Sequence, residues 1–125
     1  MNRPPNPLGK KGEDLAAEFL RKNGYRIIER NYRCRGGEID VIACERDTLC
    51  FVEVKSRGSE DYGGPEQAIT ATKKRRMTHA ALFYLTQKRI QDADWRFDAV
   101  TVVMTNAGTE MELIRGAFLP TVPLP

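Results

Sequence analysis

Charged side chains interrupt two apolar segments of the chain, and this feature most constrains how it can fold. Residues 38–44 (EIDVIAC) and 49–55 (LCFVEVK) are rich in Val, Ile and Phe, which favours β-strands. The polar residues between them are few enough to form a hairpin. An unpaired charge away from water is costly, so the acids and the lysine within these strands need partners. The pattern indicates a metal site, a tight ion pair or a catalytic centre.

A two-residue turn at 46–47 would decide which residues of this hairpin face one another. Asp40 would then face Glu53, and Glu38 would face Lys55. Side chains alternate with period two, so all four would lie on one face of the sheet. Like charges directly opposite destabilise a sheet unless a cation lies between them. Arg-Asp is not a preferred pair for a primed turn, and a slip of one residue would separate the carboxylates.

The paired carboxylates suggest hydrolysis assisted by a divalent metal. Mg²⁺ prefers a few carboxylate oxygens plus water, and it commonly bridges to a substrate phosphate. Asp40 and Glu53 would supply these oxygens, with the carbonyl of Val54 as a further ligand. The ion would polarise the phosphoryl oxygen and lower the pKa of a bound water. Lys55 would orient that water or stabilise charge on the phosphate. The alternative is an ion-pair network that holds a half-exposed sheet.

The order Asp…Glu-X-Lys on adjoining strands resembles the signature of the restriction-endonuclease-like nucleases. The wider chain is similar to the YraN-like family of predicted bacterial endonucleases, whose structural analogues are archaeal Holliday junction resolvases. The matching segments are Gly9-Lys10-Lys11-Gly12-Glu13, Gly37-Glu38-Ile39-Asp40, Phe51-Val52-Glu53-Val54-Lys55, Pro65-Glu66-Gln67-Ala68 with Lys73 beyond it, and Arg96-Phe97-Asp98. They cover the chain from residue 9 to about residue 119. Ile39 departs from the eponymous nuclease motif, which has Pro at that position.

This resemblance implies a three-layer αβα restriction-endonuclease-like fold and metal-dependent cleavage of DNA, with Mg²⁺ or Mn²⁺ as the cofactor. It implies a core site at Asp40, Glu53 and Lys55. Glu13 matches the glutamate that joins the site in resolvase-like relatives, and Gln67 matches a polar position close to the metals. Such relatives act as dimers, because a four-way junction presents two symmetric cuts. The implied partner is therefore DNA, branched DNA included, and an isologous homodimer fits that requirement.

Composition and charge argue against several other classes of protein. The chain has 125 residues, of which 41% are hydrophobic and 30% charged, as expected for a single globular domain. It has no apolar run that could span a bilayer and no apolar core of a secretory signal near residue 1. We therefore expect a cytoplasmic protein without a membrane partner. Three cysteines without a Cys-X-X-Cys, and one histidine, argue against a disulfide framework, a zinc site and a histidine-rich centre.

The cations are more informative in their distribution than in their number, because the net charge is only +3. Lys73-Lys74-Arg75-Arg76 is a dense basic block near the start of a predicted helix, where the macrodipole disfavours cations. Phosphate binding would explain this placement. Lys10 and Lys11, at the start of the first predicted helix, are further candidates for DNA contacts. For most other cations a solvated surface is the simpler explanation.

The whole chain predicts an α/β domain with the order α-β-β-β-α(α)-β-β. Helices are predicted over residues 10–23 and from 65 to about 87 with a break near 70–72, and strands over 25–32, 38–44, 49–55, 95–105 and 110–115. A helical crossover places the next strand parallel to an earlier one, so about five strands would form a mixed sheet with helices on its faces. We expect a disordered leader at 1–8, one nuclease-like domain at 9–119, a mobile loop at 57–65 and a loose tail at 120–125.

Three functions remain open from the sequence. The first is a metal-dependent endonuclease that hydrolyses DNA phosphodiester bonds, on branched or otherwise structured DNA. The second is a non-catalytic DNA-binding protein on a nuclease scaffold, which would explain the basic block. The third is a protein that docks on a larger complex, which would leave the carboxylates unexplained. Asp98, a further acid in an apolar run, is equally compatible with orienting a site residue and with a salt bridge at the start of its strand.

Overall fold

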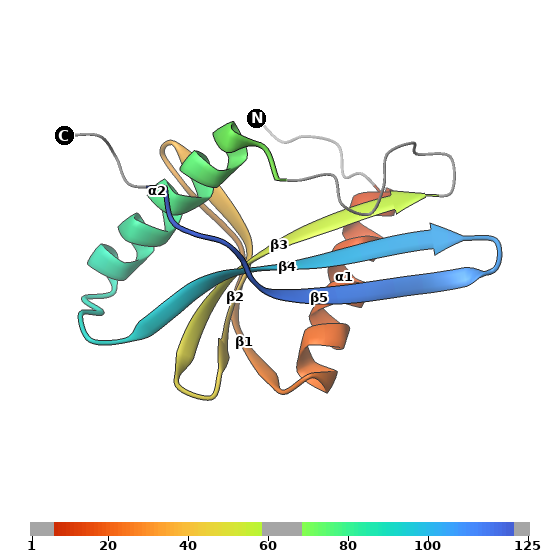
Figure 1. The fold of residues 1–125 in the computed structure, drawn as a ribbon, viewed down its shortest axis with the longest axis horizontal. Helices are drawn as coiled ribbons and strands as arrows, with labels where there is room; N and C mark the ends of the chain where they lie inside the picture. The colour runs from red at the N-terminus through yellow and green to blue at the C-terminus, as the bar shows by residue number, and fades with distance from the viewer. Residues whose placement is uncertain (1–6, 59–68, 122–125) are drawn as a thin grey trace.

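Five strands form one mixed sheet between two helices in the computed structural model of the chain (Figure 1). The structure describes residues 7–58 and 69–121. The elements are α1 (Pro7–Lys22), β1 (Tyr25–Cys34), β2 (Gly37–Glu45), β3 (Thr48–Gly58), α2 (Ala71–Gln87), β4 (Asp94–Thr105) and β5 (Gly108–Phe118). The strands lie in the sheet in the order β1-β2-β3-β4-β5. The predicted α/β fold with helices on the faces of a mixed sheet is therefore confirmed.

The helix α2 carries the chain across the sheet from β3 to β4. These two strands are neighbours and run parallel, whereas the pairs β1–β2, β2–β3 and β4–β5 are antiparallel. A parallel pair needs a crossover connection, which α2 and its flanking segments supply. The predicted parallel return after the helical segment is thus confirmed.

The hairpin of β2 and β3 has the predicted register at its turn. Ile42 lies opposite Phe51, and Cys44 lies opposite Leu49. The two-residue turn places Arg46 at a φ of 54°. Tight hairpin turns need a positive φ, which a residue other than glycine adopts at a cost. The apolar pairs of the hairpin outweigh that cost, because a one-residue slip would turn them toward the wrong face.

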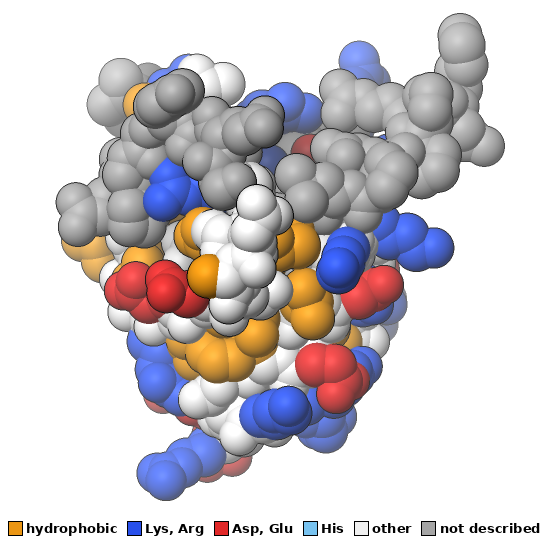
Figure 2. All heavy atoms as spheres, turned by 90° about the vertical axis from the view of Figure 1, so that its right-hand side faces the viewer, with side chains coloured by type: hydrophobic (Ala, Val, Ile, Leu, Met, Phe, Trp, Pro, Cys, Tyr) orange, Lys and Arg blue, Asp and Glu red, His pale blue; other side chains and the backbone are white. Residues whose placement is uncertain are grey.

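Two apolar clusters hold the helices against opposite faces of the sheet. The cluster beneath α1 includes Ala16, Leu20, Val41, Val52 and Val100. The cluster beneath α2 includes Ile39, Ile42, Phe51, Met77, Ala80, Ala81 and Phe97. The hairpin β4–β5 extends toward the right-hand side of Figure 1, and from that side apolar side chains are visible among charged ones (Figure 2).

The ends of three elements differ from the predictions. The helix α1 begins at Pro7, so Pro7 and Leu8 belong to it and not to a leader, while residues 1–6 of the predicted leader lie outside the described residues. The strand β3 continues to Gly58 and takes up the first two residues of the predicted loop. The remainder of that loop, through 65, also lies outside the described residues.

The helix α2 begins at Ala71 after an N-cap. The hydroxyl of Thr70 accepts a hydrogen bond from the backbone N–H of Lys73 at 3.1 Å, as an N-cap side chain does. The predicted helical turn at 65–68 falls outside the described residues. At the other end of the chain, the N–H of Thr121 donates to the hydroxyl of Thr78 at 3.1 Å, which ties the start of the predicted tail to α2. Neither helix in the described part of the chain has the length and apolarity to cross a membrane.

Candidate active site

Asp40 and Glu53 meet where the ladder between β2 and β3 ends. The last residues of that ladder are Val41 and Val52. Beyond them, Oδ2 of Asp40 accepts a hydrogen bond of 2.8 Å from the backbone N–H of Val54. The carboxyl group of Glu53 lies within hydrogen-bonding reach of the Asp40 carboxyl group. The structure therefore brings together the two acids that the sequence analysis singled out.

The pleat of β2 slips by one residue at Asp40. Ile39 and Ile42 both pack beneath α2, whereas Val41 packs beneath α1. Strict alternation would put Ile39 and Val41 on the same face. The prediction that regular alternation along β2 sets the direction of the Asp40 side chain is therefore wrong. On β1, Asn31 lies between the residues paired with Val41 and Ile39 and has a φ of 55°. The two strands are irregular together at this position, and the irregularity turns the Asp40 side chain toward β3.

Burial strongly affects the protonation of Glu53. Glu53 is only 7% exposed. Burial raises the pKa of Glu53 well above its ordinary value of 4.5, and the contact with Asp40 raises it further, while Lys73 lowers it. Two carboxyl groups in contact cannot both be ionised cheaply without a proton or a cation between them. The pair is therefore a place where a proton and a metal ion would compete.

Lys73 of α2 brings a positive charge to this pair. Its Nζ lies 3.5 Å from Oε2 of Glu53 and 3.6 Å from Oε1 of Glu38. Lys73 is in the first turn of α2, where the macrodipole disfavours a cation. The carboxylates of Glu38 and Glu53 offset the unfavourable interaction with the helix dipole. These two ion pairs explain why a cation is placed there. Glu38, predicted to face Lys55, makes ion pairs with Lys73 and with Arg33.

A glycine allows α2 to come this close to β2. A Cβ atom on Gly37 would lie 2.1 Å from the backbone oxygen of Arg76 and 3.1 Å from the Cβ of Ala80. Any side chain at this position would push the helix away from the strand. Gly37 therefore controls the distance over which Lys73 reaches Glu38 and Glu53.

Glu13 approaches the pair from the α1 layer. A Cβ atom on Gly12 would lie 2.0 Å from the hydroxyl oxygen of Ser56, so α1 packs on β3 without an intervening side chain. Burial raises the pKa of Glu13, and the charge of Asp40 raises it further. The charge of Asp40 therefore reaches Glu13, and the membership of Glu13 in the site stays a prediction.

The other predicted site residues differ in what the structure says of them. Lys55 lies on β3, two residues after Glu53, and is partly buried. Val54 contacts Asp40 through its N–H, and the role of its carbonyl as a ligand stays a prediction. Gln67 lies outside the described residues.

The donor set of the described residues suits a hard cation that keeps water ligands. No group of three or more His, Cys, Asp or Glu side chains is arranged to hold a metal ion within residues 7–58 and 69–121. Mg²⁺ is nevertheless commonly bound through one or two carboxylates, with water and substrate phosphate supplying the rest. Asp40 and Glu53 fit that requirement because their contact needs a positive partner. A zinc centre takes three or four protein ligands, often His or Cys, and the paired carboxylates of Asp40 and Glu53 do not supply such a set.

The predicted basic block divides into residues with different neighbours. Lys73 pairs with the acids of the site, and Nζ of Lys74 lies 5.7 Å from the ring centroid of Phe118. Arg75 and Arg76 are exposed on α2. Lys10 and Lys11 are exposed on α1. Their contacts with DNA stay predictions.

The basic block predicts Lys73 only as a phosphate ligand, whereas the structure also pairs it with Glu53. A signal was present, because four cations near a helix N-terminus require a compensating charge. The identity of the compensating acids could not be read from spacing, since residues 59–70, between β3 and α2, have no regular pattern in the sequence.

Asp98 belongs to a separate network on the α1 face. It is fully buried and stands level with Val52 on the neighbouring strand, on the other side of the sheet from Glu53. Its carboxylate accepts hydrogen bonds from the hydroxyl of Tyr25 at 2.6 Å, Nε of Arg96 at 2.8 Å and the N–H of Gly116 at 2.9 Å. Of the two roles considered for Asp98, the structure supports the salt bridge.

Comparison with known proteins shows which protein family the chain matches. The model of the family described as "Uncharacterised protein family UPF0102" matches residues 12–102, which include Glu13, Asp40, Glu53 and Lys73. A UPF0102 protein of Syntrophus aciditrophicus is 51% identical over 110 residues, covering 88% of this chain and 87% of the relative. UPF0102 proteins of Geobacter metallireducens and Caldicellulosiruptor saccharolyticus are 46% and 44% identical, each over 89% of this chain and over 91% and 96% of their own lengths. The chain therefore belongs to the UPF0102 family, the YraN-like family that its motifs resemble.

Proposed function

We propose that this protein is a metal-dependent endonuclease that hydrolyses phosphodiester bonds of branched or otherwise structured DNA. The observation that carries the proposal is the contact between the carboxyl groups of Asp40 and Glu53. Asp40 is partly buried, and Glu53 is almost fully buried beside Lys73. Structural ion-pair networks normally match acids with bases and do not bring two acids together. A divalent cation bound between two carboxylates offsets their mutual repulsion, so a metal site explains such a contact.

The residues of the site would divide the work of hydrolysis. Asp40 and Glu53 would hold Mg²⁺ or Mn²⁺, with the carbonyl of Val54 and the carboxylate of Glu13 nearby as further oxygen donors. When bound, the ion polarises the phosphoryl oxygen and lowers the pKa of a coordinated water. Lys55 would orient the attacking water or stabilise the charge that develops on the phosphate.

Lys73 would act as a second positive charge at the site. A divalent cation bound to Glu53 would neutralise its charge and so weaken its attraction for the Lys73 ammonium. Lys73 could then pair with a phosphate oxygen of the substrate. Arg75 and Arg76, exposed on the same helix, would place the DNA backbone without reading its sequence.

The first test is cleavage of a panel of linear, flapped and four-way DNA by purified protein. We expect scission with Mg²⁺ or Mn²⁺ and none with EDTA. Asp40→Asn and Glu53→Gln should each lower the rate by about 100-fold or more, because each removes a metal ligand. Glu112→Gln, at an exposed acid on β5, is the matched control and should keep full activity. Calorimetry should show Mn²⁺ binding that both site variants lose.

Full activity in Asp40→Asn or Glu53→Gln would refute the assignment. Salt-sensitive DNA binding without scission, indifferent to Mg²⁺ and to Asp40, would instead support the second candidate function, a non-catalytic DNA-binding protein. The exposed Arg75 and Arg76 favour that alternative. Sedimentation of the protein with a four-way junction would show whether two copies bind, as a symmetric pair of cuts requires.

A further inference from the structure

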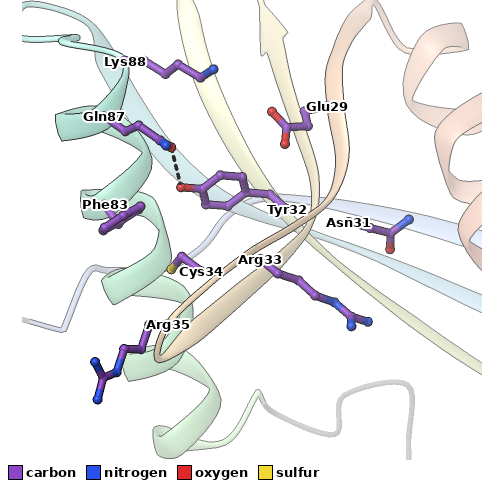
Figure 3. A pocket seen from close by; sticks show the side chains of 9 residues that line it. All are labelled: Glu29, Asn31, Tyr32, Arg33, Cys34, Arg35, Phe83, Gln87 and Lys88. Atoms are coloured by element: carbon purple, nitrogen blue, oxygen red, sulfur yellow. Dashed lines mark hydrogen bonds between the residues drawn. The ribbon is translucent and has the colours of Figure 1, made fainter. Parts of the chain in front are cut away.

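A hollow of about 500 Å³ lies between the C-terminal half of β1 and the C-terminal half of α2 (Figure 3). We call it the β1–α2 groove and define it by Arg33 and Arg35 on the strand side, Phe83, Gln87 and Lys88 on the helix side, and Tyr32 between them. The hydroxyl of Tyr32 donates to Oε1 of Gln87 at 3.2 Å, which joins the two sides (Figure 3). None of these residues belongs to the carboxylate site.

The groove is positively charged and open to solvent. Three of its lining residues are cations, Arg33, Arg35 and Lys88, against one acid, Glu29. The Arg33 side chain is 73% exposed, and Arg35 and Lys88 are also exposed. Cations that line a concave surface concentrate the field there and attract an anionic ligand.

An exposed aromatic ring lines the same hollow as these cations. Phe83 is 46% exposed although it is a large apolar residue, and it lines the groove from α2. The neighbouring Tyr84 is buried, with its ring packed edge-on against Tyr32 at a centroid distance of 5.2 Å. Tyr84 belongs to the apolar cluster beneath α2, whereas Phe83 keeps nearly half of its surface open, where its ring can stack with a planar ligand.

Ion pairs connect the groove with the carboxylate site. Nε of Arg33 lies 3.4 Å from Glu38, Glu38 lies 3.6 Å from Nζ of Lys73, and Nζ of Lys73 lies 3.5 Å from Glu53. Each step is between neighbouring side chains, so Glu38 and Lys73 lie between the groove and the buried Glu53. A DNA strand bound in the groove would therefore continue toward the carboxylate site, where cleavage is proposed.

We propose that the β1–α2 groove binds a single-stranded segment of the DNA substrate, with a base stacked on Phe83 and phosphates on Arg35 and Lys88. The combination of a cationic groove with an exposed aromatic ring is how proteins hold single-stranded nucleic acid, because every base offers a face for stacking. An acidic peptide would use the cations but would leave the ring without a role. This inference rests on the proposed function and narrows its substrate to duplexes that carry a single-stranded arm.

The test compares two DNA ligands that differ only in such an arm. The Asp40→Asn protein is titrated, by fluorescence anisotropy, onto a blunt duplex and onto the same duplex with a thymidine tail of about ten nucleotides. We expect the tail to tighten binding. Phe83→Ala and Arg35→Glu should each weaken binding of the tailed duplex by about tenfold, while binding of the blunt duplex stays the same. Phe83→Trp, which keeps a stacking ring, should retain the effect of the tail.

Two matched controls lie close by on the same elements. Leu82 is 40% exposed on α2 but does not line the groove, so Leu82→Ala removes a similar exposed apolar side chain. Arg26 is exposed on β1 and also lies outside the groove, so Arg26→Glu makes the same charge change as Arg35→Glu. Both controls should keep the effect of the tail, and thermal melts should show that all variants fold.

The groove proposal fails if the tail adds no affinity, or if Phe83→Ala and Arg35→Glu bind the tailed duplex as tightly as the controls do. It also fails if an acidic peptide displaces the tailed duplex equally well from the protein with Phe83 and from Phe83→Ala. In each of these results the unsubstituted protein can still bind and cleave duplex DNA, which leaves the proposed nuclease function standing. Absence of any DNA binding by the unsubstituted protein would overturn both proposals.

Discussion

At the scale of single residues, the site is a conflict between like charges that the fold maintains. Glu53 is almost fully buried, touches Asp40 and is only partly compensated by Lys73. A protein that used these residues for stability alone would gain by replacing one acid with an apolar side chain. The arrangement is instead typical of functional sites, where perturbed pKa values collect.

The raised pKa of Glu53 predicts how pH affects the metal-free protein. Because the folded pKa lies above the ordinary value of 4.5, the contribution of Glu53 to stability is full below that value and is lost as the pH rises through the folded pKa. Glu53→Gln keeps the shape without the charge, so it should be more stable than the unsubstituted protein at pH 8 by on the order of 1 kcal/mol. Near pH 4 the difference should vanish.

Urea unfolding in EDTA across this pH range measures the difference, with Glu112→Gln as the control at an exposed position. If Glu53→Gln proved much less stable than the unsubstituted protein at pH 8, the ion pair with Lys73 would outweigh the repulsion by Asp40. The cluster would then be a structural salt bridge.

At the scale of elements, two close approaches of helix to strand build the site. Gly12 lets α1 rest on Ser56 of β3, and Gly37 lets α2 rest against β2. The first brings Glu13 toward Asp40, and the second brings Lys73 over Glu53. Both glycines lie in segments that the sequence analysis matched to the nuclease family, and packing gives each a physical reason.

Substitution of Gly37 should therefore disturb both stability and the site. Gly37→Ala places a Cβ 2.1 Å from a backbone oxygen of α2, which cannot move without shifting the helix. We expect a loss of about 1–3 kcal/mol in the free energy of unfolding, together with reduced cleavage. Gly58→Ala is the control, because its Cβ would meet its nearest neighbour at 3.9 Å. Equal unfolding midpoints in urea for the two variants would contradict this account.

At the scale of the whole molecule, ion pairs join strands that are distant in sequence. Glu45 at the end of β2 accepts hydrogen bonds from Arg96 of β4 and from Arg115 of β5, the latter at 2.6 Å. Arg96 continues to the buried Asp98. This network lies away from the carboxylate site, and its acids are matched with bases, so it serves to hold the sheet together.

The network makes the fold sensitive to acid. The hydrogen bond from Arg115, with that from Arg96, lowers the pKa of Glu45 to about 2. The contribution of Glu45 to stability is therefore present above its ordinary pKa of 4.5 and is lost as the pH falls toward 2. Glu45→Gln should lower the free energy of unfolding by about 1–2 kcal/mol at pH 7 and by much less near pH 2.

Thermal melts of Glu45→Gln as a function of pH provide the measurement. Asp47→Asn, an exposed acid in the adjacent turn, is the matched control and should change little at either pH. A difference between Glu45→Gln and the unsubstituted protein that stayed constant from pH 7 to pH 2 would show that the charge of Glu45 does not matter.

The sequence by itself determined what depends on neighbours along the chain. The apolar pattern and the short connection were enough for the register of the β2–β3 hairpin, because a slip would expose Ile42 and Phe51. The long helical segment was enough for the parallel pair β3–β4, because no shorter connection can make one. The motifs around Asp40 and Glu53 were enough for the family.

Only the tertiary structure decided how the acids of the site are oriented and balanced. Asp40 turns toward Val54 through an irregularity that β2 shares with Asn31 of β1, and periodicity within one strand carries no sign of it. Lys73 reaches Glu53 because α2 packs across Gly37, a contact between segments separated by a crossover. Long-range packing sets such distances, and the local pattern of residues does not encode them.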